Sequence, residues 1–204
     1  MFAKKLTDDL RTAANDKHLS VDFYLIPQQP TEKAGDDARY RRDMAQANCG
    51  FEKAEHLSGN IGYLKITQFA EPRECGDVAI AAMGFVANSD ALIFDLRENG
   101  GGAPRMIELL STYLFEITTH LNDFFLRKEN ETNQLWTLPY VPGKRLADRP
   151  VYVLVSKNTF SAGEEFGYNL KALKRATLVG ETTAGGAHPV GPHRIDAHFT
   201  VLVR

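Results

Sequence analysis

Ser161 stands between an apolar run and a helical pattern, where a serine can serve either of two roles. Ser161 and Glu164 have the spacing of a capping box, in which the two residues satisfy N–H groups at a helix start. The same position suits a nucleophile, because the helix N-terminus and the N–H of Ala162 would stabilise a developing oxyanion. Residues 158–160 are Asn-Thr-Phe rather than a Gly-x-Ser elbow, so an ordinary α/β-hydrolase is disfavoured.

Two further turns follow apolar runs. Residues 95–104 are rich in glycine, but they lack the spacing of a dinucleotide fingerprint and the Gly-Lys-Ser/Thr of a phosphate loop. This turn is either a tight loop that opens a helix or a loop whose bare N–H groups face a reacting oxygen. Residues 180–189 contain His188, and they form either a flexible turn or the segment that carries a histidine to the site.

Apolar patterns predict the elements that hold these turns. Apolar runs at 91–94, 151–155 and 176–179 are typical of buried strands, and helical spacing occurs at 106–114 and 166–173. Alternation of strand and helix at this spacing predicts an α/β fold with a parallel sheet. The remaining patterns predict a β-hairpin, a helix and two β-like stretches, over 51–66, 78–86 and 120–138 respectively.

The N-terminal part has a different pattern. Residues 1–15 repeat apolar side chains at helical spacing, and residues 19–25 alternate as in a strand. Residues 28–48 are polar and predict an exposed, partly helical connector. We therefore expect an N-terminal helix, strand and connector over 1–48 and the main core over 49–204. No signal-peptide core and no apolar run of membrane-spanning length is present in the sequence.

The bulk composition narrows the classes of function. A chain of 204 residues, 43% hydrophobic and 25% charged, suits one soluble globular domain with a short extension. The net charge of -2 gives no reason to expect nucleic acid or an anionic membrane as a partner. Cys49 and Cys75 lack metal-ligand spacing, so we expect two free thiols, with one disulfide as the alternative. The compartment cannot be read from these residues.

Three ordered motifs resemble the tail-specific (C-terminal processing) serine protease family. They are Asp95-Leu-Arg97-x-Asn99-x-Gly101-Gly102, Ser161-Ala-x-Glu164 and Arg175-Ala-x-x-Val179-Gly180-Glu181. Residues 135–144 and 180–189 resemble the branch of interphotoreceptor retinoid-binding protein modules and their bacterial relatives. The resemblance covers residues 2–196 and implies an α/β core of the Clp-protease/crotonase type, with Ser161 as nucleophile. It implies an oxyanion hole from the N–H of Ala162 and a glycine of the 100–102 loop, which we expect to be Gly101.

The base is less well defined than the nucleophile. Many members of this family use a lysine 25 positions after the serine, but Gly186 occupies that position, so a Ser/Lys dyad is excluded. The family's other solution is a histidine from an upstream Asp-x-His segment, which Asp16-Lys-His18 matches, and imidazole titrates near neutrality. His188 is the alternative base, and a site without a competent base is the third alternative.

Two parts of the family pattern are missing. Roughly 30 residues separate His18 from Phe51, too few for the PDZ module that often stands there. Relatives continue beyond the position of Arg204 with further core strands, so we expect the C-terminus of the core to be truncated, with an acidic residue that orients the histidine in the missing tail. Exposed strand edges left by this truncation would favour a homo-oligomer.

The resemblance implies a serine-type peptidase that acts on peptides or proteins through an acyl-enzyme, without a cofactor or metal. A metal site of His188, His193 and His198 is disfavoured because five-residue spacing fits no known ligand pattern. The alternative is a weak or inactive homologue that binds a retinoid or fatty acid. The aromatic and apolar residues available to line a cleft are Trp136, Leu138 and Tyr140. Relatives are often exported, and the compartment of this chain stays unknown.

Overall fold

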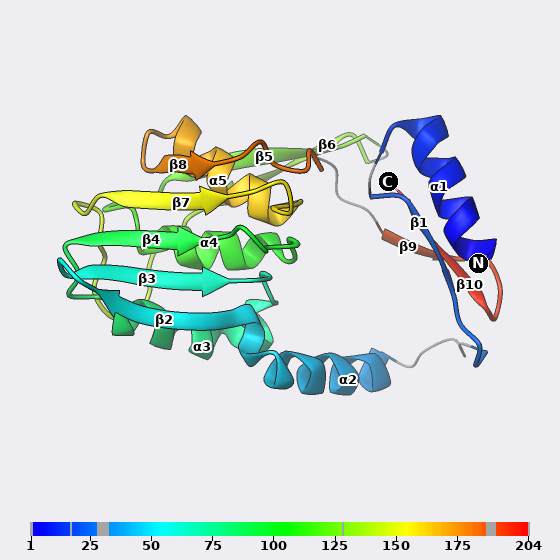
Figure 1. Cartoon of the computed structure of the whole chain (residues 1–204), viewed down its shortest axis with the longest axis horizontal. Coiled ribbons are helices and arrows are strands. Elements are labelled where there is room, and N and C mark those ends of the chain that lie inside the picture. Colours follow the sequence, from blue (N-terminus) through cyan, green and yellow to red (C-terminus); the bar gives the residue numbers. More distant parts are fainter. Residues whose placement is uncertain (1, 17, 28–32, 128, 187–190, 204) are drawn as a thin grey trace. The chain divides into compact units, whose positions relative to one another are not determined.

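A computed structural model describes residues 2–16, 18–27, 33–127, 129–186 and 191–203 (Figure 1). The chain forms two compact units, the terminal unit (Met1–Arg41 with Gly185–Arg204) and the core unit (Arg42–Ala184). This division differs from the expected one, because it groups the last twenty residues with the N-terminal segment. The reason is strand pairing between the two ends of the chain, which sequence patterns do not reveal.

The terminal unit contains one helix and a three-stranded antiparallel sheet of order β1-β10-β9. Helix α1 is held on the first strand by two side chains. Thr7 Oγ1 accepts the N–H of Val21 at 2.9 Å, and Arg11 Nε donates to the carbonyl of Leu19 at 2.8 Å. The predicted N-terminal helix and strand are confirmed. The elements are α1 (Phe2–Ala14), β1 (Ser20–Phe23), β9 (Gly191–Arg194) and β10 (Phe199–Val203).

The core unit has a five-stranded sheet of order β2-β3-β4-β7-β8, parallel except for the hairpin of β2 and β3. Its strands are β2 (Phe51–Leu57), β3 (Ile61–Ile66), β4 (Ala91–Asp95), β7 (Val151–Val155) and β8 (Thr177–Gly180). Three helices cover one face (Figure 1): α3 (Pro72–Phe85), α4 (Pro104–Thr112) and α5 (Ala162–Ala172). The predicted α/β class and parallel sheet are confirmed.

The remaining elements connect or flank this sheet. Strands β5 (His120–Leu126) and β6 (Glu131–Trp136) form a separate antiparallel hairpin. Helix α2 (Lys33–Gln46) contains the boundary between the two units, and the short 3₁₀ helix η1 (Asn48–Gly50) precedes β2. The predicted connector is therefore largely helical.

The core lies between the sheet and its helices. The rings of Phe69 and Phe94 pack against the ring of Phe166 from α5, with centroids 5.6 and 5.3 Å away. All three side chains are buried. Parallel strands end at the same edge of a sheet, so the turns after β3, β4 and β7 are neighbours. This edge holds two of the three turns that the sequence marks as chemically interesting, together with the start of the third, which follows β8.

The expectation of two free thiols was wrong. Cys49 of η1 and Cys75 of α3 form a disulfide, with Cα atoms 5.6 Å apart, and both residues are buried. That separation lies within the range that a disulfide requires. The pairing depends on how α3 packs beside the start of β2, and a separation of 26 residues along the chain does not reveal this.

Candidate active site

Ser161 lies at the turn between β7 and α5 in a strained backbone conformation, with φ 52° and ψ −122°. An ordinary N-cap residue is extended, so capping alone does not account for this geometry. The carboxylate of Glu164 accepts the N–H of Ser161 at 2.9 Å, and Thr183 Oγ1 donates to the same carboxylate at 2.6 Å. A strained serine on a strand-to-helix turn is typical of a nucleophile.

The turn before Ser161 is hydrogen-bonded to the turn after β4. Buried Thr159 donates its hydroxyl to the carbonyl of Leu96 at 2.7 Å and accepts the N–H of Ser156 at 2.9 Å. One residue later, the N–H of Phe160 donates to the carbonyl of Asn99 at 2.9 Å. These bonds hold the serine turn against the glycine loop, residues 100–102.

The glycine loop in turn pairs with Phe69, in the turn after β3. The N–H of Phe69 donates to the carbonyl of Gly101 at 2.8 Å, and the N–H of Ala103 donates to the carbonyl of Phe69 at 2.6 Å. Gly101 (φ 98°) faces the serine, since a Cβ there would lie 2.8 Å from Cβ of Ser161. A Cβ at Gly102 (φ 130°) would lie 2.0 Å from the carbonyl oxygen of Phe69. Both positions therefore require glycine.

The directions of the loop N–H groups follow from these bonds. The N–H of Gly101 donates to Oδ1 of Asn99 at 2.8 Å. The peptide bonds of the described residues are trans, so the N–H of Gly102 points opposite to the carbonyl of Gly101. That carbonyl is directed at Phe69, on the β3 side of the loop. The N–H of Gly102 is therefore directed to the other side, where the turn of Ser161 lies in the strand order.

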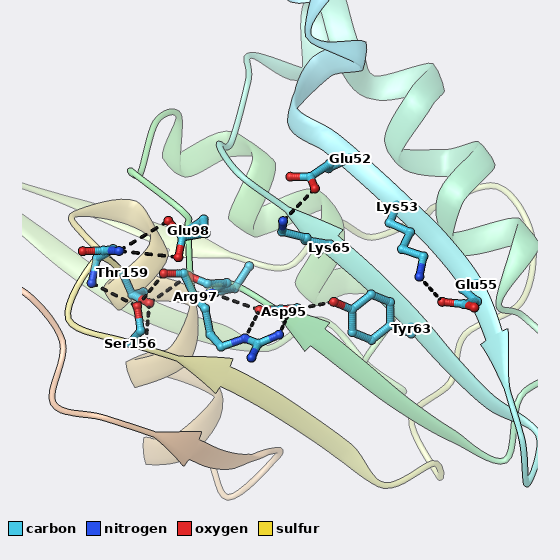
Figure 2. Close-up of polar contacts among 12 residues, drawn as sticks. Glu52, Lys53, Glu55, Tyr63, Lys65, Asp95, Arg97, Glu98, Ser156 and Thr159 are labelled. Carbon is cyan, nitrogen blue, oxygen red and sulfur yellow. Dashed lines mark hydrogen bonds and ion pairs between the residues drawn. The ribbon is translucent and has the colours of Figure 1, made fainter.

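A charged network occupies the other sheet face at the end of β4 (Figure 2). The carboxylate of Asp95 accepts two bonds from the Arg97 guanidinium, at 2.9 and 2.6 Å, and one from the hydroxyl of Tyr63 at 2.6 Å. Burial disfavours the charged form of Asp95, but the bonds from Arg97 and Tyr63 outweigh it and lower its pKa to about 2. Burial and the bond to Asp95 raise the pKa of Tyr63 to about 12. The expected pairing of Asp95 with Arg97 is present.

The candidate base lies in the terminal unit. Nδ1 of His18 is 3.3 Å from Oδ1 of Asp16, and the main-chain N–H of His18 donates to the same oxygen at 2.9 Å. Both residues are buried. Asp16 is thus one carboxylate that contacts His18, and the acidic residue expected after Arg204 stays a prediction. His188, the alternative base, lies outside the described residues.

The sequence analysis did not predict a role for the residues beside the first turn of α5. Asn122 of β5 donates its amide to the carboxylate of Glu165 at 2.9 Å, which anchors the β5–β6 hairpin next to the serine turn. Burial raises the pKa of Glu165, and it also raises the pKa of Glu108 on α4. Neither carboxylate has a spacing that would have marked it. Trp136, expected in the cleft, ends β6 with its ring 4.9 Å from the ring of His120.

The described residues offer neither a metal-binding cluster nor a membrane-spanning helix. That part of the chain contains no group of three His, Cys, Asp or Glu side chains that could hold a metal ion. His198, a member of the disfavoured metal set, donates from Nδ1 to the carbonyl of Tyr24 at 2.8 Å. No helix among residues 2–16, 33–127 and 129–186 combines the length and the apolar character needed to cross a bilayer.

Comparison with known proteins decides the family. Residues 60–200 match the sequence profile of Peptidase family S41. The chain belongs to peptidase family S41. It is 33% identical over 128 residues to the carboxyl-terminal-processing protease of Synechocystis sp., covering 62% of this chain and 28% of that protein. The corresponding protease of Picosynechococcus sp. is 29% identical over 163 residues, covering 79% of this chain and 38% of that protein.

The S41 chain therefore spans little more than a third, at most, of these relatives. Solved structures share its fold. A putative peptidase from Parabacteroides merdae has a TM-score of 0.64 at 20% identity, covering 99% of this chain and 69% of that one. A putative S41 protease from Bacteroides fragilis has a TM-score of 0.62 at 23% identity, covering 76% of this chain and 44% of that one. The predicted tail-specific protease family and its fold class are confirmed.

Proposed function

We propose that this S41 chain is a serine peptidase unit in which Ser161 is the nucleophile. The observation that carries the proposal is the strained turn of Ser161 lying directly against the glycine loop, where a side chain at Gly101 would collide with the serine. Such packing leaves backbone N–H groups, rather than side chains, around the reacting atoms. This environment suits the attack of a hydroxyl on a peptide carbonyl.

Two N–H groups would form the oxyanion hole. The first belongs to Ala162, which begins α5, where the helix dipole adds positive potential. For the second we assign Gly102 in place of Gly101, because the N–H of Gly101 donates to Asn99. Gly101 contributes instead by its missing side chain, which lets the loop approach Ser161.

His18 is the proposed base, with Asp16 holding its ring by Nδ1. Nε2 would take the proton of the Ser161 hydroxyl as the serine oxygen bonds to the carbonyl carbon. The tetrahedral oxyanion would then collapse, and the leaving amine would depart with the proton from Nε2. Water, deprotonated by the same imidazole, would hydrolyse the acyl-enzyme and restore the serine. His188 stays the alternative source of the base.

Cleavage of an unfolded polypeptide tests the proposal. The unsubstituted chain should produce fragments, and Ser161→Ala should abolish cleavage while its thermal unfolding is unchanged. Ser58→Ala removes an exposed serine in the β2–β3 turn and serves as the matched control, with activity retained. His18→Ala should lower the rate by at least about 10³-fold, since triad members act as a unit. Cleavage that survives Ser161→Ala would overturn the proposal.

The apolar-ligand alternative has less support. A cavity of about 170 Å³ lies between Pro150–Tyr152 and Lys174–Thr177, at the sheet end opposite Ser161. It is smaller than the usual ligand pocket of about 300 Å³ or more, and lysine and arginine are among its lining residues. Retinoid or fatty-acid titration monitored by the fluorescence of Trp136 tests this alternative, and a saturable change would support it.

The disulfide supports a proposal about compartment. Structural disulfides persist in oxidising environments and are rare in the cytosol. Because Cys49 and Cys75 are both buried and paired, we propose that this chain functions in an oxidising compartment. Protein taken from its native source and unfolded in denaturant should resist alkylation of both cysteines until a reductant is added. Immediate alkylation without reductant would contradict this placement.

A further inference from the structure

Asn99 is hydrogen-bonded to the end of β3, the glycine loop and the turn before Ser161, and its side chain is fully buried. Its Nδ2 donates to the carbonyl of Ile66 at the end of β3, at 3.0 Å. Its Oδ1 accepts the N–H of Gly101 at 2.8 Å. Its main-chain carbonyl accepts the N–H of Phe160, the residue before the serine, at 2.9 Å.

The side chain has no room to move. A Cβ at Gly163, in the first turn of α5, would lie 2.6 Å from Oδ1 of Asn99. The helix therefore packs directly on the amide, and both the donor and the acceptor of that amide are used. A buried polar group left without its partner is unfavourable, so the arrangement specifies one orientation of the amide.

This orientation determines the direction of the neighbouring peptides. The N–H of Gly101 is held by Oδ1 of Asn99 and its carbonyl by the N–H of Phe69, so both peptides that flank Gly101 are fixed and the N–H of Gly102 is turned away from Phe69. If the amide were lost, the Gly100–Gly101 peptide could rotate, because glycine tolerates many backbone conformations. The donor proposed for the oxyanion would then no longer be preorganised.

We infer that Asn99 is the positioning residue of this site: its amide aims the N–H of Gly102, and its carbonyl fixes the turn of Ser161. The inference rests on the proposed function for its catalytic consequence, since Asn99 itself would not touch substrate. Its geometric part, the anchoring of Gly101, stands independently of activity. The two parts can therefore be tested separately.

Amide hydrogen exchange tests the geometric part. In Asn99→Ala the N–H of Gly101 loses its acceptor, so its exchange rate should rise by at least about 10-fold. The matched control is Asn169→Ala, which removes another buried asparagine amide from the core unit and should leave the exchange of Gly101 unchanged. Equal protection of Gly101 in all three proteins would overturn the anchoring by Asn99.

The pH dependence of Asn99→Asp tests the catalytic part. A neutral carboxyl can donate to Ile66 and accept from Gly101, as the amide does, whereas the ionised form cannot donate. The quantity to compare is the rate at which a fluorophosphonate labels Ser161 in Asn99→Asp, divided by the rate for the unsubstituted chain at the same pH. This ratio should lie about 100-fold below one near pH 8. At about pH 5 the buried acid is neutral, so the ratio should return toward one.

Division by the parent rate removes the titration of the base from this profile. Asn169→Asp, the control for a buried acid elsewhere, should give a ratio that does not change with pH. A ratio near one at every pH in folded Asn99→Asp would overturn the positioning role. If the unsubstituted chain shows no labelling that depends on Ser161, the proposed function fails, and the exchange of Gly101 still decides the geometric claim.

Discussion

One stretch of the chain contains two halves with different surroundings. The charged half, Asp95–Arg97, lies on the sheet face away from the helices, where a carboxylate, a guanidinium and the Tyr63 hydroxyl bond to one another (Figure 2). The glycine half, Asn99–Gly102, is uncharged and lies against the turn of Ser161. A single residue, Glu98, thus separates a network that stabilises a strand end from a loop that shapes the proposed site.

The comparison teaches that a shared motif does not mean a shared role. Side-chain charges carry the interactions of the first half, so substitutions there should change the free energy of unfolding. In the glycine half, the directions of the main-chain N–H and carbonyl groups determine the interactions. Substitutions there should therefore change the reactivity of Ser161. Unfolding and fluorophosphonate labelling, measured on the same variant, separate the two quantities.

Gly101→Ala should have the largest effect on labelling. Its Cβ would lie 2.8 Å from Cβ of Ser161, and its φ of 98° is strained for alanine. We expect the rate to fall by at least about 100-fold, as for the loss of an oxyanion donor. Gly100→Ala is the control, because no atom lies within 4 Å of its added Cβ. Equal labelling rates for Gly101→Ala and Gly100→Ala would contradict the claim that the glycine half determines the reactivity of Ser161.

Asp95→Asn should lower the free energy of unfolding by about 2 kcal/mol without changing labelling per folded molecule. The folded pKa of Asp95, about 2, lies below its unfolded value. Its contribution is therefore present above the unfolded pKa of about 4 and is lost as the pH falls through the folded value. Chemical denaturation from about pH 5 to about pH 2 measures this loss, which Asp95→Asn should reduce. Asp90→Asn, in an exposed ion pair, is the control.

Gly163→Ala should lower labelling by about 10-fold through Asn99, since its methyl would meet Oδ1 at 2.6 Å. Alanine ordinarily stabilises a helix relative to glycine by about 1 kcal/mol. Gly76→Ala in α3 makes only van der Waals contacts and should show that ordinary gain, with labelling unchanged. If Gly163→Ala is labelled at the rate of the unsubstituted chain, the positioning role of Asn99 is contradicted.

Tyr63→Phe should have the smallest effect, a loss of about 1 kcal/mol for one hydrogen bond. The pKa of Tyr63 is raised to about 12, so its contribution is present below the unfolded pKa of about 10 and is lost as the pH rises through 12. Ultraviolet titration of phenolate should lose its last component in the variant. A change in labelling would instead connect the charged half to the site.

Much of this arrangement could be predicted from sequence. Apolar periodicity predicted the strands around 91–94 and 151–155, and turn composition marked both Ser161 and the glycine loop. Three features could not be predicted, because they depend on long-range packing or on peptide direction. These are the Cys49–Cys75 disulfide, the pairing of β1 with β10, and the use of the Gly101 N–H by Asn99.

The burial of Glu165 beside Asn122 also could not be predicted from the sequence. No spacing in the sequence brings β5 to the first turn of α5, although the two residues are 2.9 Å apart in the fold. A motif of short range therefore marked Ser161 as the proposed nucleophile, and only the folded chain identified what surrounds it.

Mass-spectrometric mapping of the fluorophosphonate adduct tests the central claim most directly. The unsubstituted chain, labelled and digested, should have one modified site, in the peptide that contains Ser161, and denaturation before labelling should abolish the adduct. Adducts distributed over other serines, or a folded chain that takes up no probe, would contradict the assignment of Ser161 as an activated nucleophile.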